Sequence, residues 1–254
     1  MPVSRTAPGD HRPRPQTNLI PAMPAQLPLQ LSFPEAPRFD QFHAGNNREV
    51  IEILKDCARG VGESYLFLWG DEGCGKTHLL HACCREAHGK GEAVGYLPMT
   101  ELVAYGPEIL QGLEQMALLC IDDIHALAGK PRWEEALFHG FNRWRENSIR
   151  LIISANQAPA ELPIALPDLK TRLTWGLTLR LHPFNDEDKL AALQLRARQL
   201  GLELSPQVGR FLLTHTPRDL PSLWRLLNSL DQATLAAKRK LTIPFLKDYL
   251  ESES

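Results

Sequence analysis

The 254-residue chain has no long apolar run, few cysteines and no excess of either charge. Without a run of about 18 to 20 apolar residues, no membrane-spanning helix is expected. The 28 basic and 30 acidic residues nearly cancel, so we do not expect nucleic acid to be bound through an overall positive charge. The five cysteines are odd in number and lack the paired C-x-x-C spacing of zinc sites, which predicts reduced thiols: Cys57, Cys74, Cys83, Cys84 and Cys120.

The N-terminal segment also lacks the features of a signal peptide. Arg5, Arg12 and Arg14 are not followed by an apolar stretch with a small-residue cleavage site, so a cytoplasmic location is expected. Nine of the chain's 20 prolines fall in residues 1–37, which show no helical or strand period. Because each proline fixes its own φ and favours extended neighbours, residues 1–38 are predicted to be a proline-rich tail, disordered or extended over 1–24.

From residue 39 onward, apolar runs alternate with helical patterns. Continuous apolar runs of this kind are typical of a parallel sheet that is covered by helices on both faces. The sequence therefore predicts an α/β domain over residues 39–182. The expected strands are 65–69, 93–97, 118–121, 151–155 and 177–181, and the expected helices include 48–59 and 77–88.

After Pro183 the pattern becomes purely helical. Asn185 is a candidate N-cap followed by three acidic residues, which favour the first turn of a helix, and Ser205 with Pro206 marks a second helix start. Leucines at 220, 223, 227 and 230 continue at helical spacing. Residues 183–254 are therefore predicted to form a separate helical domain.

The most specific motif is GDEGCGKT at residues 70–77, which fits G-x-x-x-x-G-K-[ST] between a predicted strand and a predicted helix. Its glycines allow backbone N–H groups to turn toward phosphate oxygens, Lys76 can reach the β- and γ-phosphates, and the Thr77 hydroxyl can ligate Mg²⁺. The alternative is a glycine-rich turn that merely connects strand and helix. The full match in the required context favours binding of ATP or ADP with Mg²⁺. Candidate nucleotide-binding residues are Gly73, Cys74, Gly75, Lys76, Thr77 and His78.

Two acidic residues follow the apolar strand 118–121, about 45 residues after this loop. A carboxylate at the carboxyl end of a strand can hold the Mg²⁺ shell, which makes Asp122 the metal candidate together with Thr77. Asp123 would then orient or activate the attacking water. Without the phosphate-binding loop, paired acids would more simply cap a strand or begin a helix.

Three later polar residues complete an order of motifs along the chain that resembles the order found in AAA+ ATPases. Asn156 follows a predicted strand, Arg172 precedes the last strand, and Arg218 lies in the helical domain. Each alone is more simply a loop or surface residue. The chain resembles the DnaA family in particular, and within it the Hda-type regulators. This resemblance spans about residues 25–252 and is carried by residues 39–47, 166–176, 185–198 and 239–245.

The resemblance implies roles for these residues. Asn156 corresponds to sensor 1, Arg172 to the arginine finger and Arg218 to sensor 2, whereas Asn47 lies at the entrance of the nucleotide pocket. The fold it implies is a P-loop AAA+ parallel sheet flanked by helices, with a C-terminal all-helical lid. The tail segment QLPLQL at residues 26–31 resembles the peptide that engages the DNA polymerase sliding clamp, with Gln26, Leu27, Leu29 and Leu31 as anchors. It departs from the usual pattern at Pro28 and Gln30, and residues 30–33 offer a second register.

The implied function is regulation of replication initiation. A protein of this kind binds the sliding clamp, reaches DNA through it, and stimulates hydrolysis of the ATP bound to DnaA through an arginine finger in trans, which prevents re-initiation. It can also self-associate through AAA+ interfaces. Whether the chain hydrolyses its own nucleotide stays open. The acidic end at residues 251–254 differs from the basic helix-turn-helix of a DnaA initiator, so direct reading of DNA sequence is not expected. The basic residues 238–240 are interpreted as a solvated helix face.

Other classes of protein share part of this pattern. A helicase loader or a transposition-helper ATPase would have the same nucleotide apparatus but would be expected to lack the segment 26–31. A small-molecule kinase would need an acceptor pocket and an arginine cluster in its lid, and the sequence indicates neither. An adaptor with an inactive nucleotide site is hard to reconcile with the intact Lys76, Thr77, Asp122 and Asp123.

Overall fold

The structure is a computed structural model that describes residues 37–237 and 241–252. Nearly all of the predicted tail 1–38, including the candidate clamp peptide at 26–31, lies outside the described residues, as do the basic residues 238–240. In the described part of the chain, no helix is both long and apolar enough to cross a membrane.

Five parallel strands form a single sheet in the order β2-β3-β4-β1-β5. All five predicted strands are confirmed, and no strand end differs from its predicted position by more than one residue. Their bounds are β1 Tyr65–Trp69, β2 Val94–Pro98, β3 Leu118–Asp122, β4 Arg150–Ala155 and β5 Leu177–Arg180. Because the strands are parallel, their carboxyl ends meet at one edge of the sheet, where the loops that carry the predicted site begin.

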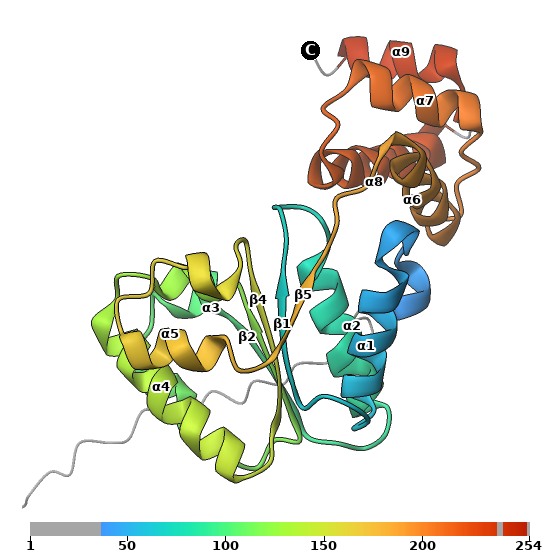
Figure 1. Cartoon of the computed structure of the whole chain (residues 1–254). Coiled ribbons are helices and arrows are strands. Elements are labelled where there is room, and N and C mark those ends of the chain that lie inside the picture. The colour runs from blue at the N-terminus through green and yellow to red at the C-terminus, as the bar shows by residue number, and fades with distance from the viewer. Residues whose placement is uncertain (1–36, 238–240, 253–254) are drawn as a thin grey trace, which may run out of the picture. The chain divides into compact units, whose positions relative to one another are not determined.

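Helices cover both faces of this sheet (Figure 1). One face is packed by α1 (Arg48–Ala58) and α2 (Lys76–His88), and the other by α3 (Met99–Leu102), α4 (Pro131–Glu146) and α5 (Pro167–Leu173). Along β3, Cys120 belongs to the core under α1 and α2, and its neighbour Ile121 to the core under α4. Every residue of β3 is buried, which explains why this strand reads as a continuous apolar run.

The sequence did not predict α4 and α5. The helix α4 is rich in aromatic residues and contains Gly140, which weakens a helical pattern. In the structure this glycine makes room for Trp144, because a Cβ at position 140 would lie 2.9 Å from Cζ2 of that ring. Packing of the fully buried Trp144 therefore explains a glycine that local propensity disfavours.

The C-terminal part is all-helical, as predicted. It comprises α6 (Asp186–Gln199), α7 (Pro206–His215), α8 (Leu220–Ala237) and α9 (Ile243–Ser252). Both predicted N-caps are confirmed, since Asn185 Oδ1 accepts the Asp188 N–H at 2.7 Å and Ser205 Oγ accepts the Val208 N–H at 3.3 Å. A leucine core, to which Leu223, Leu227 and Leu230 contribute, holds these helices together.

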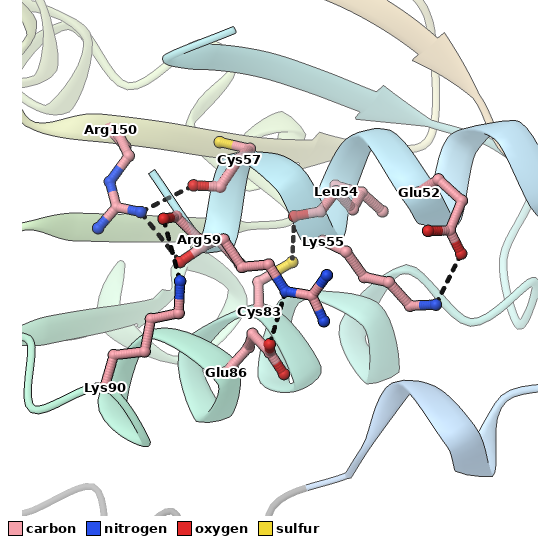
Figure 2. Close-up of polar contacts among 10 residues, drawn as sticks. Glu52, Leu54, Lys55, Cys57, Arg59, Cys83, Glu86, Lys90 and Arg150 are labelled. Atoms are coloured by element: carbon pink, nitrogen blue, oxygen red, sulfur yellow. Dashed lines mark hydrogen bonds and ion pairs between the residues drawn. The ribbon is translucent and has the colours of Figure 1, made fainter. Parts of the chain in front are cut away.

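Arg150, the first residue of β4, ties α1 to the sheet (Figure 2). Its Nη1 donates to the carbonyls of Cys57 and Ala58 at 2.8 and 2.9 Å, where α1 ends. Its Nη2 pairs with Glu92, and the side chain is only 11% exposed. The Cys57 carbonyl also accepts the Gly60 N–H at 3.0 Å, so the guanidinium matters most for the Ala58 carbonyl at the end of the helix.

Replacing Arg150 by alanine should lower the free energy of unfolding by about 2 to 4 kcal/mol, because the Ala58 carbonyl and the Glu92 carboxylate lose their partner. Urea denaturation measures this. The matched control is Arg59→Ala, which removes the more exposed ion pair between Arg59 and Glu86 and should change stability little (Figure 2). Equal stability of Arg150→Ala and wild type would contradict this role.

Candidate nucleotide-binding site

The glycine-rich loop 70–75 joins β1 to α2 and has the backbone that its motif predicts. Gly73 and Gly75 adopt φ values of 75° and 101°, which favour glycine. A Cβ at Gly75 would lie 2.5 Å from the Phe42 ring, and one at Gly73 would lie 2.8 Å from Cδ of Pro221. Both positions therefore require glycine for backbone conformation and for space.

Lys76 is buried at the start of α2, with its side chain turned against the loop. Its Nζ donates to the carbonyls of Gly70 and Asp71 at 2.9 and 3.1 Å. Neutral carbonyls do not neutralise a buried ammonium, so the site favours an anionic ligand. The free N–H groups at the start of α2, where the exposed Thr77 is the second residue, provide further donors for phosphate.

The two acidic residues lie at the carboxyl end of β3 and are held by the neighbouring strands. Asp122 is buried and accepts hydrogen bonds from the Tyr96 hydroxyl at 2.7 Å and from the Ser154 hydroxyl. Asp123 follows in the left-handed region, with φ 54°, and its N–H donates to Ser154 Oγ at 2.9 Å. Ser154 thus joins the carboxylate of one acid to the backbone of the other.

The surroundings of Asp123 place it within electrostatic reach of the loop. Burial and the charge of Asp122 raise the pKa of the Asp123 carboxyl, while His125 and Lys76 lower it by less. Asn156 comes next to the loop as well, because Ala155 at the end of β4 accepts the Gly70 N–H at 3.3 Å. The loop, both acids and Asn156 therefore gather at one edge of the sheet.

These residues fit a nucleotide with Mg²⁺. Among residues 37–237 and 241–252, no cluster of three or more histidine, cysteine, aspartate or glutamate side chains could hold a metal ion by itself. Mg²⁺ in nucleotide sites takes one or two protein ligands and completes its shell with phosphate and water. A carboxylate fixed at Asp122 and a hydroxyl at Thr77 are suited to that arrangement, and their ligation of Mg²⁺ stays a prediction.

The predicted pocket residues Asn47 and His78 contact backbone groups, and Cys74 is buried. Both amide atoms of the buried Asn47 bond to the backbone of His182, with Oδ1 accepting its N–H at 2.7 Å and Nδ2 donating to its carbonyl at 3.0 Å. His78 Nε2 lies 3.0 Å from the Arg38 carbonyl, and burial lowers the pKa of its imidazole. Burial raises the pKa of the Cys74 thiol. Direct contact of these side chains with nucleotide stays a prediction.

Arg218 lies in the helical domain, three residues before Pro221, which contacts Gly73 of the loop. The Arg218 guanidinium itself donates from Nε to the Leu213 carbonyl at 2.9 Å and lies 3.6 Å from Asp186. The start of α8 is therefore next to the phosphate-binding loop, whereas contact between Arg218 and a nucleotide stays a prediction.

Arg172 lies far from the loop. It occupies the last turn of α5, where the next carbonyl, that of Leu173, accepts the Tyr65 hydroxyl at 3.0 Å. Gly176 packs directly against Tyr65, the first residue of β1, whereas the loop follows the last residue of the same strand. The strand spans about 16 Å. Figure 1 shows α5 entering β5 at the end of the sheet opposite to the one where β1 leads into α2.

Sequence reasoning missed Tyr96, Ser154 and Pro221, which support the predicted site residues. Tyr96 and Ser154 are themselves buried within their strands, where a hydroxyl among apolar residues was the only available signal. Their role depends on strand order, because β2, β3 and β4 are neighbours only in the folded sheet.

Removing either hydroxyl should free the Asp122 carboxylate to turn. We expect Tyr96→Phe or Ser154→Ala to raise the Mg²⁺ concentration that gives half-maximal nucleotide binding by about 10-fold, as for other residues that orient metal ligands. A Mg²⁺ titration at fixed ATP measures the shift. Tyr105→Phe, at a tyrosine that is 71% exposed, is the matched control. An unchanged Mg²⁺ midpoint in both variants would show that these hydroxyls do not position Asp122.

Comparisons with known proteins agree with this geometry. The family model described as the bacterial DnaA ATPase domain matches residues 35–180, and the one described as "Hda, lid domain" matches residues 186–250. Domain III of the replication initiation protein DnaA from Thermotoga maritima superposes with a TM-score of 0.73 at 22% identity, over 82% of this chain and 92% of that one.

Two further solved structures share the fold. The AMPPCP-bound DnaA from Aquifex aeolicus superposes with a TM-score of 0.63 at 26% identity, covering 76% of this chain and 65% of that chain. The Holliday junction branch migration motor RuvB from Thermotoga maritima gives a TM-score of 0.58 at 18% identity, over 85% and 73% of the two chains. At that identity the likeness to RuvB shows the fold alone.

Proposed function

Since the chain belongs to the bacterial DnaA ATPase family and carries a lid of the Hda type, we propose that it stimulates hydrolysis of the ATP held by DnaA while bound to the sliding clamp. In this proposal the chain docks against DnaA on clamp-loaded DNA and supplies Arg172 to the ATP of DnaA. The product, DnaA with ADP, would no longer initiate replication. DNA is reached through the clamp, in the cytoplasm.

The observation that carries this proposal is the position of Arg172. The residue is partly exposed at the end of β1 opposite to the chain's own phosphate-binding loop. An arginine there is remote from the γ-phosphate of its own subunit but available to a nucleotide on a neighbouring subunit. Guanidinium groups supplied in trans stabilise the charge that develops on the transferred phosphoryl group.

The chain's own site has a second role in the proposal. Gly73, Gly75 and Lys76 would bind the phosphates of ATP or ADP, as the AMPPCP in the related Aquifex aeolicus DnaA supports. Thr77 and Asp122 would hold Mg²⁺, which neutralises phosphate charge. Because Pro221 at the start of α8 touches Gly73, the bound nucleotide would also set how the lid meets the α/β domain.

The proposal is tested by measuring hydrolysis of DnaA-bound ATP with and without the chain, and with and without clamp loaded on DNA. Faster hydrolysis is expected only when both the chain and the loaded clamp are present. Stimulation without the clamp would overturn the clamp part of the proposal. The absence of stimulation in all mixtures would overturn the function and would favour a helicase-loader or transposition-helper ATPase instead.

The tail provides a separate prediction for the clamp. Replacing Gln26, Leu27 and Leu29 together by alanine should abolish pull-down by the clamp and leave nucleotide binding intact, because an extended peptide places its leucines in apolar pockets. The matched control replaces Gln16, Leu19 and Ile20 in the same tail. If the first variant is still retained by the clamp, the anchor lies elsewhere.

A further inference from the structure

The guanidinium of Arg172 lies over two aromatic rings that come from different elements. Its Cζ is 4.4 Å from the centroid of Phe138, on α4, and 4.9 Å from the centroid of Trp175, in the turn between α5 and β5. Cations at this distance from a ring face are attracted by its quadrupole. The side chain therefore has a defined resting place although it lies at the surface.

No carboxylate in the described part of the chain pairs with Arg172, so its charge is not neutralised. Arg143, on α4, shows the contrast, because its Nε donates to Glu114 at 2.8 Å. An ion pair occupies the N–H donors at the edge of a guanidinium, whereas ring contacts use only its flat faces. The five donors of Arg172 therefore stay available to phosphate oxygens.

Trp175 is fixed by its backbone but open at its ring. Its N–H donates to the Arg172 carbonyl at 3.1 Å, and the next residue, Gly176, packs against Tyr65 so closely that a Cβ would lie 2.5 Å from that ring. The side chain is nevertheless 49% exposed, and Arg145 Cζ also lies 4.7 Å from its centroid. The indole meets Phe141 of the core in a T-shaped contact, with ring centroids 6.2 Å apart, yet about half of it stays in solvent among cations, which core packing alone does not explain.

We propose that Trp175, together with Phe138, is a positioning residue for Arg172. The two rings hold the guanidinium by its faces and direct its N–H edge outward to the nucleotide of the docked partner. This inference rests on the proposed function, since it concerns how Arg172 is oriented for the hydrolysis of DnaA-bound ATP. Because the rings already restrict the arginine side chain, it loses less conformational freedom when it meets the phosphate. The rings therefore affect the rate of hydrolysis in the docked complex rather than docking itself.

The test uses Trp175→Leu, Trp175→Phe and Phe138→Leu in the hydrolysis assay with DnaA-ATP and clamp-loaded DNA. We expect Trp175→Leu and Phe138→Leu to lower the maximal stimulated rate about 10-fold, with the half-saturating concentration of the chain nearly unchanged. Trp175→Phe keeps a ring face and should restore most of the rate. Arg145→Ala is the matched control on the same ring and should stimulate normally.

A second readout does not depend on DnaA. Phenylglyoxal modifies exposed guanidinium groups, and peptide mass spectrometry gives the rate at Arg172 relative to Arg132, which is 80% exposed. Trp175→Leu should speed labelling of Arg172 severalfold and leave Arg132 unchanged. Unaltered labelling would overturn the proposed stacking, even if a variant were impaired for another reason.

The outcomes separate this inference from the function on which it rests. Normal stimulation by Trp175→Leu, or failure of Trp175→Phe to restore it, would overturn the positioning role. A raised half-saturating concentration at an unchanged maximal rate would assign Trp175 to docking instead. If the unaltered chain does not stimulate hydrolysis, the proposed function fails. If Arg172→Ala itself stimulates normally, the finger is another residue and the inference fails with it; if only Arg172→Ala is defective, the function stands and the inference fails.

Discussion

Arg172→Ala is expected to abolish stimulated hydrolysis of DnaA-bound ATP and to leave the chain's own nucleotide affinity unchanged. Arginine fingers contribute about 10³ to 10⁵ in rate, which is the largest single effect available in this system. The side chain lies at the opposite end of β1 from the phosphate-binding loop, so its removal does not touch the loop. Arg172→Lys should be nearly as defective, because an ammonium lacks the planar fork of donors and the flat faces.

The measurement is the rate of phosphate release from DnaA-ATP at saturating chain and clamp. Arg132→Ala, which changes another exposed arginine on the same side of the sheet, is the control and should stimulate like wild type. Retained stimulation by Arg172→Ala would place the finger on another residue. A parallel loss of nucleotide binding would show instead that the substitution disturbed the fold.

The second large effect is expected at Lys76. Lys76→Ala should weaken binding of ADP and ATP by about 100-fold, since it removes charge-assisted hydrogen bonds to phosphate. Among the residues that the structure describes, the buried Nζ donates to the carbonyls of Gly70 and Asp71 and pairs with no carboxylate, so a phosphate gains a cation without breaking an ion pair there. Titration with a fluorescent ADP analogue measures the change.

Two companion variants sharpen this prediction. Gly75→Ala should also impair binding, because φ 101° is strained for alanine and the new Cβ would meet Phe42 at 2.5 Å. Lys130→Ala removes an exposed lysine whose contact is the Ala126 carbonyl, and should bind normally. Wild-type affinity in Lys76→Ala would contradict the assignment of residues 70–77 as a phosphate-binding loop.

The sheet could be predicted because its strands are buried on both faces. The run at β3 contains no polar residue before Asp122, and all of its residues are in the core. The order β2-β3-β4-β1-β5 was not predictable, since pairing joins segments far apart in the chain, such as Tyr65 with Leu151. Helix α5 was missed for a local reason: its seven residues are too few to show a period.

The site, like the sheet, was predictable only where its residues are contiguous in the chain. The glycine-rich loop is contiguous, so its spacing alone specifies phosphate binding. The supports of the site come from distant positions: Ser154 bonds to both acids across neighbouring strands, and Asn47 bonds to His182, 135 residues away. The rings at Phe138 and Trp175 that flank Arg172 likewise meet only after α4 packs beside α5.

The central claim is that the chain acts on the nucleotide of DnaA rather than on its own. The most direct measurement places γ-phosphate-labelled ATP on one protein and unlabelled ATP on the other, mixes them with clamp-loaded DNA, and then reverses the label. Mixing is expected to accelerate release of label from DnaA, and Arg172→Ala is expected to remove this acceleration. Accelerated release only from the chain's own site, or no acceleration with either label, would contradict that claim.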